Sequence, residues 1–166
     1  MHGLFRKKIT VLMVCSANIC RSPIAQGVLE QLIRERGLKN RIRVDSAGTH
    51  VPRIGTRPDP RAIRAAEECG ISIKRYRSRM LAPADYERCD YIVAMDQQNL
   101  GHMRRECPQE YSHKLSSVID YLPGAALDEV PDPYFGNQEG FQRVVDLLQP
   151  ACSGFLDYLS RERGLS

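Results

Sequence analysis

The chain has 166 residues, a formal net charge of +4 and no tryptophan. This length favours one domain, covering residues 1–166, with room for a hydrophobic core. The mild positive charge suits an anionic substrate but lies far below that of a nucleic-acid-binding protein, and no aromatic residues alternate with basic ones. We therefore expect no nucleic acid among the partners.

The cysteines and the first residues bear on the compartment. Six cysteines without a recognisable leader argue against a disulfide framework. Arg6, Lys7 and Lys8 precede an apolar run that is too short for a signal peptide, and no stretch approaches the length of a membrane span. We expect residues 1–8 to form a loose tail, the protein to be cytoplasmic, and no membrane to be a partner.

Taken in order, the elements alternate between strands and helices. Strands are predicted over residues 9–14, 42–46, 91–95 and 115–119, and helices over 22–36, 61–69, 84–89, 97–106 and 140–163. Pro150 falls inside the last helix and predicts a kink or a break there. Residues 121–138 form a long loop, which is typical of a functional segment. This alternation predicts an α/β fold with a parallel sheet covered by helices on both faces.

The segment from Cys15 to Arg21 lies between the first strand and the first helix. Ser22 and Pro23 suit the N-cap and the first position of that helix. Backbone N–H groups in the segment would then converge beside a helix N-terminus, an arrangement that binds an oxyanion. Arg21 adds a planar guanidinium suited to two phosphate oxygens, and a thiolate at Cys15 would be placed for in-line attack on phosphorus. The segment comprises Cys15, Ser16, Ala17, Asn18, Ile19, Cys20 and Arg21.

Cys15, Arg21 and an aspartate of the long loop each have a simpler, structural interpretation as well. Cys15 could be a core cysteine and Arg21 a surface residue, but the position of the motif between a buried strand and a capped helix favours the functional interpretation. In the long loop, Asp132 precedes Pro133 and could be either a turn residue or the general acid of a phosphatase. The residues alone leave these two roles of Asp132 open.

The stretch VCSANICRSPIAQGVLE resembles the opening of the low-molecular-weight protein tyrosine phosphatases, whose pattern is Val-Cys-x-Gly-Asn-x-Cys-Arg-Ser-Pro. The resemblance continues through DSAGT at 45–49, YIVAMD at 91–96, Asn99, and DPYF at 132–135, so it covers nearly the whole chain. It implies a three-layer fold with a four-stranded sheet in the order 2-1-3-4 and an N-terminal phosphate-binding loop. It also implies hydrolysis of phosphotyrosine through a cysteinyl-phosphate intermediate.

The resemblance assigns roles outside the loop as well. Asp132 matches the acid that protonates the phenol oxygen and then activates water. Tyr134 and Phe135 would wall a cleft around the aromatic leaving group, although either could instead pack within the loop. Ser22 could hydrogen-bond the sulfur and help it leave, besides capping the helix.

Three positions concern the support of the phosphate loop. Asn18 and Ser46 match side chains that hydrogen-bond this loop in the family. Tyr76 stands where the family often has a histidine three residues before an arginine, here Arg79, so we expect a modified brace. Ala17 replaces a glycine, and alanine carries a strain cost if that position requires a positive φ.

Cys20 shares the loop with Cys15. The resemblance implies a reversible Cys15–Cys20 disulfide after oxidation by peroxide, while a simpler role for Cys20 is to fill space. The other cysteines show no metal-ligand spacing and the histidines are scattered, so we expect no metal and no cofactor. The cysteines interpreted as core or surface thiols are Cys69, Cys89, Cys107 and Cys152.

Three functions compete for this sequence. The first is a protein tyrosine phosphatase, with a phosphotyrosine-containing protein as partner and a monomer as the default state. The second is a thiol-dependent arsenate reductase of the same fold, which would need a relay of further cysteines, yet Cys89 and Cys107 lie far apart in sequence. The third is a phosphate-binding module, which would lack the nucleophile or the acid. We favour the phosphatase because Cys15 and Asp132 are both present.

Overall fold

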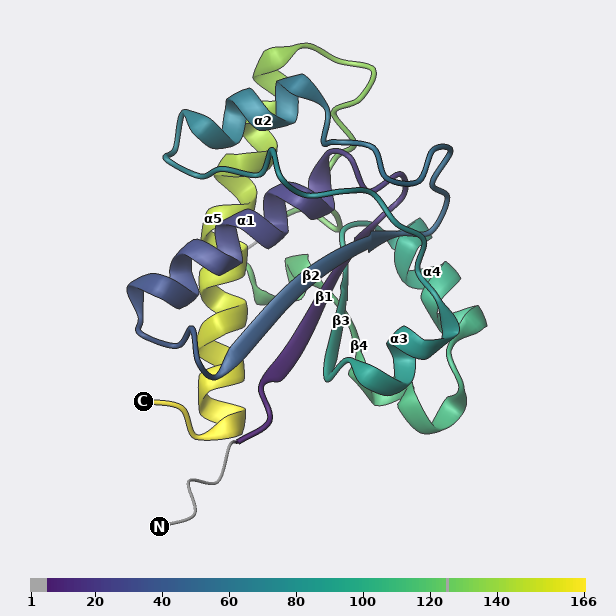
Figure 1. Cartoon of the computed structure of the whole chain (residues 1–166), viewed down its shortest axis with the longest axis vertical. Helices are drawn as coiled ribbons and strands as arrows, with labels where there is room; N and C mark the ends of the chain where they lie inside the picture. Colours follow the sequence, from purple (N-terminus) through teal and green to yellow (C-terminus); the bar gives the residue numbers. More distant parts are fainter. Residues whose placement is uncertain (1–5, 125) are drawn as a thin grey trace.

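The computed structural model describes residues 6–124 and 126–166 (Figure 1). Its parallel strands form one sheet: β1 (Ile9–Cys15), β2 (Ile42–Gly48), β3 (Tyr91–Ala94) and β4 (Leu115–Ser117). The four strands lie in the order β2-β1-β3-β4, which confirms the order implied by the resemblance. Of the expected tail, residues 1–5 lie outside the described residues, and residues 6–8 are exposed.

Helices cover both faces of the sheet (Figure 1). One face carries α1 (Arg21–Glu35), α2 (Pro60–Glu67) and α5 (Gln138–Arg163), and the other carries α3 (Pro83–Arg88) and α4 (Gln97–Glu106). Side chains of β1 alternate between two apolar clusters, with Val11 and Met13 in one and Leu12 and Val14 in the other. Burial on both faces is the reason that β1 is apolar along nearly its whole length.

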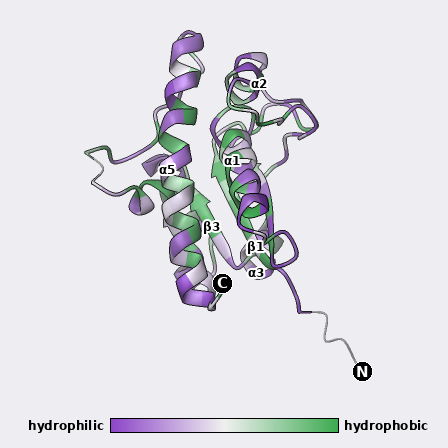
Figure 2. Cartoon of the chain, turned by 90° about the vertical axis from the view of Figure 1, so that its left-hand side faces the viewer, coloured by the Kyte–Doolittle hydropathy of each residue, from purple (hydrophilic) through white to green (hydrophobic). Residues whose placement is uncertain are grey.

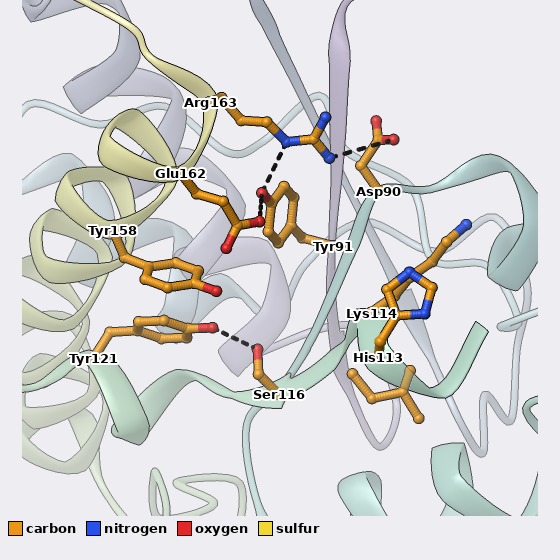
Figure 3. Close-up of a pocket in the computed structure, with 10 residues that line it drawn as sticks. Asp90, Tyr91, His113, Lys114, Ser116, Tyr121, Tyr158, Glu162 and Arg163 are labelled. Carbon is orange, nitrogen blue, oxygen red and sulfur yellow. Dashed lines mark hydrogen bonds and ion pairs between the residues drawn. The ribbon is translucent and has the colours of Figure 1, made fainter. Parts of the chain in front are cut away.

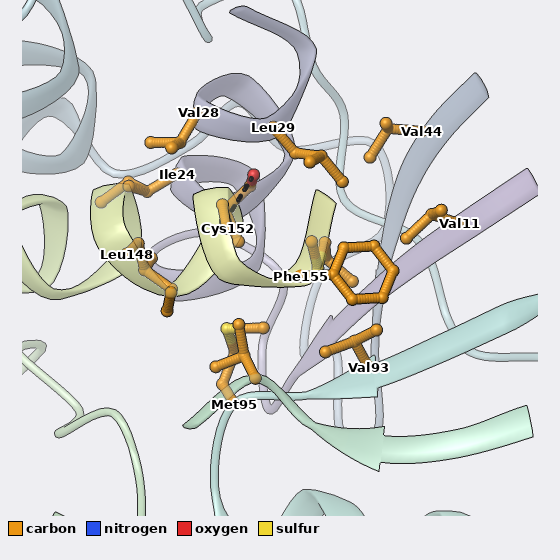
Figure 4. Close-up of a cluster of buried hydrophobic side chains, with 14 of the residues drawn as sticks. Val11, Ile24, Val28, Leu29, Val44, Val93, Met95, Leu148, Cys152 and Phe155 are labelled. Atoms are coloured by element: carbon orange, nitrogen blue, oxygen red, sulfur yellow. Dashed lines mark hydrogen bonds between the residues drawn. The ribbon is translucent and has the colours of Figure 1, made fainter. Parts of the chain in front are cut away.

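The long helix α5 packs against α1 and the sheet. Leu148, Cys152 and Phe155 project from α5 towards α1 and the strands, and all three are fully buried (Figure 4). Figure 2 shows the hydrophobic strands behind α1 and α5. Burying each large apolar side chain contributes roughly 2 kcal/mol. This interface therefore stabilises the strand from which the candidate site begins.

Pro150 does not interrupt α5. The helix is continuous from Gln138 to Arg163, so the break considered from the sequence is wrong. Pro150 and Asp146 both lie on the exposed side, where the carbonyl that loses its helical partner can bond to water. Neither α5 nor any other helix within the described residues is long and apolar enough to cross a bilayer.

Several element boundaries also differ from the predictions. α1 begins at Arg21, so Ser22 is not its N-cap. β2 continues to Gly48 because that residue still pairs with Cys15 of β1. β4 ends at Ser117, where a single 3-10 turn, η2 (Val118–Tyr121), begins. A second 3-10 segment, η1 (Gln109–Lys114), precedes β4 and was not predicted.

A polar cavity of about 390 Å³ lies at the amino ends of β3 and β4 (Figure 3). Its side chains bond to one another: the Tyr121 hydroxyl donates to Ser116 Oγ at 3.0 Å, and Arg163 Nε donates to the Tyr91 hydroxyl at 3.0 Å. Ligands of parallel sheets bind at the carboxyl ends of the strands. This cavity therefore lies at the opposite edge of the sheet from the candidate site described next.

Candidate active site

A cavity of about 240 Å³ opens at the carboxyl end of β1, where the loop of residues 16–20 joins the strand to α1. Parallel sheets bind anionic ligands at this edge because the N-termini of the following helices point there. Segments that are far apart in sequence meet around the cavity. Its lining consists of Cys15, Ser16, Ala17, Ile19, Cys20, Arg21, Pro52, Asp132 and Tyr134.

Cys15 has a defined hydrogen-bond environment. It is 2% exposed, and its Sγ lies 2.9 Å from Ser22 Oγ. The Ser22 hydroxyl accepts a hydrogen bond from Asn18 Nδ2 at 2.8 Å, and its one proton can point either to the sulfur or to the more distant Ala47 carbonyl at 3.4 Å. Ser22 is thus engaged with the thiol, which is the physical reason that it does not cap α1. The N-cap of α1 is Cys20, with no side-chain cap bond.

Asn18 holds the loop in a left-handed turn. It is buried, its φ is 59°, and it is the only non-glycine residue with positive φ in the described part of the chain. Its Nδ2 also donates to Ser46 Oγ at 3.0 Å, and its Oδ1 accepts from the backbone N–H of Arg79 at 3.0 Å. Asparagine tolerates this conformation better than most residues. Ala17 has no positive φ, so the strain that its replacement of glycine could have caused does not arise.

The Arg21 guanidinium is buried beside the cavity. Its Nη1 donates to Asp96 Oδ2 at 2.6 Å and to the Val130 carbonyl at 3.1 Å. Burial acts against its charge, but the Cys15 sulfur and the Asp96 carboxylate raise the pKa of Arg21 above its usual value. The structure therefore presents a fixed positive charge to the cavity next to the thiol.

Sequence reasoning assigned no role to Asp96 or Asn99, although both lie in the motifs that carried the resemblance. Asp96 is the N-cap of α4: its Oδ1 accepts from the backbone N–H of Asn99 at 2.7 Å. Asn99 Nδ2 donates in turn to Ser16 Oγ at 3.2 Å. An aspartate directly after a buried strand and before a helix is a recognisable N-cap at the ligand-binding edge, and this signal could have identified it.

Asp132 reaches the cavity from the long loop before α5. Its Oδ2 lies 3.7 Å from Arg21 Nη2, and its side chain is 48% exposed. Its Oδ1 accepts from the backbone N–H of Tyr134 at 3.1 Å. Tyr134 lines the cavity, whereas Phe135 is 93% exposed, lies outside the lining and contacts Tyr134 edge-on at 5.0 Å between ring centroids.

Arg61 fastens this loop to α2. It forms two close contacts with Asp59, at 3.0 and 2.9 Å, while Asp59 caps α2. Its Nη1 and Nη2 donate to the carbonyls of Gly136 and Tyr134 at 3.1 and 3.0 Å. Hydrogen bonding to Asp59 is the main reason that the pKa of Arg61 is raised. The segment carrying Asp132 is therefore tied at two carbonyls to a neighbouring helix.

Within the described residues, Tyr76 forms no hydrogen bond to the phosphate loop itself. Its hydroxyl donates to Glu30 Oε2 at 2.5 Å, and Gln26 Nε2 donates to Glu30 Oε1 at 3.1 Å. Gln26 Oε1 accepts from Ser46 Oγ at 2.7 Å, which continues the chain of hydrogen bonds to Asn18. Tyr76 thus reaches the loop through side chains of α1 and β2.

Cys20 lines the same cavity as Cys15, and both thiols are free in this structure. Burial raises the pKa of the Cys20 thiol, and the nearby Cys15, Asp59 and Asp132 add to the shift, against the lowering effect of Arg61. Cys20 is therefore held as a neutral thiol, and Cys15 is the member of the pair that faces Arg21 and Ser22.

A cysteine beside a buried guanidinium, on a strand–loop–helix turn with a carboxylate opposite, is an arrangement typical of phosphoric monoester hydrolases. A family model described as low molecular weight phosphotyrosine protein phosphatase matches residues 10–165. The chain belongs to this family and is a low-molecular-weight protein tyrosine phosphatase. Membership of the family implies that its substrates are proteins that carry phosphotyrosine. The first of the three functions weighed from the sequence is the one that the comparison shows.

Named relatives and solved structures match this chain over nearly its full length. The chain is 34% identical to the low molecular weight protein-tyrosine-phosphatase YfkJ of Bacillus subtilis, over 95% of this chain and 99% of that protein. It is 35% identical to the chicken (Gallus gallus) phosphatase, over 89% and 94% of the two chains. The crystal structure of a protein tyrosine phosphatase from Entamoeba histolytica has a TM-score of 0.91 at 34% identity, covering 94% of this chain and 99% of that chain.

Proposed function

We propose that Cys15 is the nucleophile, Arg21 the phosphate clamp and Asp132 the general acid and base. In the first step the Cys15 sulfur attacks phosphorus, the P–O bond to the phenol breaks, and protonated Asp132 gives its proton to the leaving oxygen. In the second step ionised Asp132 takes a proton from water, the hydroxide attacks phosphorus, and the S–P bond breaks. Inorganic phosphate and the Cys15 thiolate are the products.

The observation that carries this proposal is the meeting of three groups at one cavity. Cys15, Arg21 and Asp132 come from β1, α1 and a loop more than 100 residues later, and all three line the same space. The loop residues Ser16, Ala17, Asn18, Ile19 and Cys20 would offer their backbone N–H groups to the phosphate oxygens. Ser22, hydrogen-bonded to Sγ, would stabilise the departing thiolate in the second step.

Supporting and binding roles follow from the contacts. Asn18 and Ser46 would keep the loop in shape, and Tyr76 would act on it at a distance through Glu30. Tyr134 would stack on the substrate phenol. Phe135, exposed beside Tyr134, would contact the protein surface around the phosphotyrosine.

The test is a substrate panel with matched variants. Wild type should hydrolyse para-nitrophenyl phosphate and phosphotyrosine peptides, and Cys15→Ser should abolish turnover. Asp132→Ala should lower kcat by roughly a hundredfold or more, since that is the usual size of a general acid's contribution. Asp128→Ala, an exposed carboxylate in the same loop, is the control and should retain kcat. Turnover by Cys15→Ser, or reduction of arsenate without phosphatase activity, would contradict the proposal.

Cys20 belongs to the same proposal as a redox partner. Peroxide would oxidise the Cys15 thiolate to a sulfenic acid, and the Cys20 thiol would then displace water from it to form a disulfide. This reaction would protect Cys15 from irreversible oxidation. Treatment with peroxide followed by a reductant should restore activity in wild type, and Cys20→Ser should lose this recovery; equal recovery in both would contradict the redox role.

We also propose that the chain is a monomeric single domain, residues 1–166, that acts in the cytoplasm. Free cysteines suit a reducing compartment. Light scattering at micromolar concentration and fractionation of the producing cells are the measurements that decide these two points.

A further inference from the structure

A second cavity adjoins the candidate active site. It has a volume of about 300 Å³, and Ser16 of the phosphate loop lines both this cavity and the first. The second cavity lies between the segment after β2 and the first turns of α4. Its lining includes His50, Gln97, Gln98, Asn99, His102 and Arg105.

Three of its side chains carry or can acquire positive charge. The rings of His50 and His102 pack edge-on at 5.3 Å between centroids. Arg105 follows one turn after Gly101 on α4, and a Cβ at Gly101 would lie only 3.3 Å from Arg105 Nη1. The glycine therefore leaves room for the guanidinium to fold back along the helix towards its N-terminus, the direction that helical side chains favour.

No anionic side chain balances these groups. The lining contains no aspartate or glutamate. Within the described residues, no carboxylate oxygen lies within the 4.0 Å limit of an ion pair from a nitrogen of His50, His102 or Arg105. The N-terminus of α4 is itself met by two carboxylates: Asp96 accepts from the backbone N–H of Asn99 at 2.7 Å, and Glu129 accepts from the backbone N–H of Gln97 at 2.9 Å. The positive groups of the cavity are therefore its side chains, with Arg105 the one that is always charged. The basic side chains that line the cavity, which form no ion pair within the described residues, thus remain available to an anion from outside the protein.

We infer that this cavity binds a second anionic group of the substrate, a carboxylate or a phosphate carried by the residue next to the phosphotyrosine. The inference rests on the proposed function, since it takes the phosphotyrosine to lie over Cys15. The Ser16 carbonyl accepts the backbone N–H of His50 at 2.9 Å, so one residue of the phosphate loop separates the two cavities. Neighbouring residues of a peptide, with Cα atoms about 3.8 Å apart, can place one side chain in each cavity.

The experiment compares kcat/KM for three phosphotyrosine peptides. The peptides differ only in the residue next to the phosphotyrosine, which is glutamine, glutamate or phosphoserine. Two sets are made, one with this residue directly before the phosphotyrosine and one with it directly after. Wild type should prefer glutamate over glutamine by roughly fivefold on one side, the upper range of an exposed ion pair. Phosphoserine, with more charge and three acceptor oxygens, should gain about tenfold. A kcat/KM raised for the phosphoserine peptide alone shows that the cavity recognises a phosphate group. Equal increases for the glutamate and phosphoserine peptides show that it recognises negative charge in general.

Variants locate the effect. Arg105→Gln and His102→Gln should each lower the two ratios, and the double variant should bring them close to one. Arg104→Gln removes the same charge from the neighbouring exposed residue of α4, which does not line the cavity, and should leave the ratios unchanged. Ratios near one in wild type, or an equal loss in Arg104→Gln, would overturn the inference. If the glutamine peptide itself is not hydrolysed by wild type, the proposed function fails instead.

Discussion

The guanidinium of Arg21 lies 2.6 Å from the carboxylate of Asp96, a residue 75 positions further along the chain. Their side chains are only 3% and 12% exposed. The same carboxylate caps α4 by accepting from the backbone N–H of Asn99. One side chain at the end of β3 therefore orients the arginine of the phosphate loop and starts a helix.

Removing Asp96 should affect both stability and phosphate binding. Asp96→Ala leaves a buried guanidinium without its partner, and we expect the free energy of unfolding to fall by about 3 kcal/mol. Asp96→Asn keeps a good N-cap but removes the charge, so it should restore most of the helix stability while KM for para-nitrophenyl phosphate stays raised. Urea unfolding and steady-state kinetics measure the two effects. A normal KM in Asp96→Asn would show that Arg21 is positioned without the ion pair.

The loop that carries Asp132 should depend on Arg61. Arg61→Lys keeps the charge but cannot contact Asp59 with two nitrogens and reach the carbonyls of Tyr134 and Gly136 at once. We expect kcat for phosphotyrosine peptides to fall by about tenfold, because the acid is less well placed. Arg64→Lys, an exposed arginine of α2, serves as control. Unchanged kcat in Arg61→Lys would mean that the loop holds its shape without this residue.

Buried thiols should make the protein sensitive to alkali. Burial raises the pKa of Cys152 from its usual 9.0 to about 12 and is the main cause that raises the pKa of Cys89 to about 11. Above pH 9 the unfolded chain loses these protons while the folded chain keeps them, so unfolding is favoured as pH rises. The contribution of the Cys152 thiol to the free energy of unfolding is complete below pH 9 and is lost between about pH 9 and 12.

Each buried thiol should contribute a slope of about −1.4 kcal/mol per pH unit in this window. Urea unfolding between pH 8 and 11 measures it. Cys152→Ala is less stable at neutral pH because it removes buried volume, but its stability should fall less steeply with pH than that of wild type. Parallel slopes in the two proteins would contradict the assignment to Cys152.

Gly154 should tolerate no side chain, although alanine favours helices. A Cβ at this position of α5 would collide with the Tyr121 carbonyl oxygen. We expect Gly154→Ala to lower the free energy of unfolding by about 2 kcal/mol, as overpacking does. Gly140→Ala in the same helix meets only Pro133 Cβ at 3.7 Å and should be neutral or slightly stabilising. Thermal unfolding of the two variants makes the comparison, and equal melting temperatures would refute the predicted close contact.

Much of the site could be predicted because local sequence specifies it. An apolar run, small and turn-forming residues and Arg21 occur in sequence order, and they suffice to predict a strand, an anion loop and a helix. The strand order followed from the family resemblance carried by such local motifs. Ser22 shows the limit of this reasoning: its position before Pro23 favours an N-cap, yet its hydroxyl bonds to Cys15 and Asn18.

By itself, the sequence determined where the thiol and the guanidinium stand, because both belong to one turn between adjacent elements whose geometry depends on a few neighbouring residues. Only the tertiary structure decided which groups surround them. Arg21 donates to Asp96, Tyr76 donates to Glu30, and Arg61 donates to a carbonyl of the loop that carries Asp132. These contacts form because the crossover connections of a parallel sheet bring distant segments of the chain to one edge. These contacts depend on packing between elements, which no local pattern encodes.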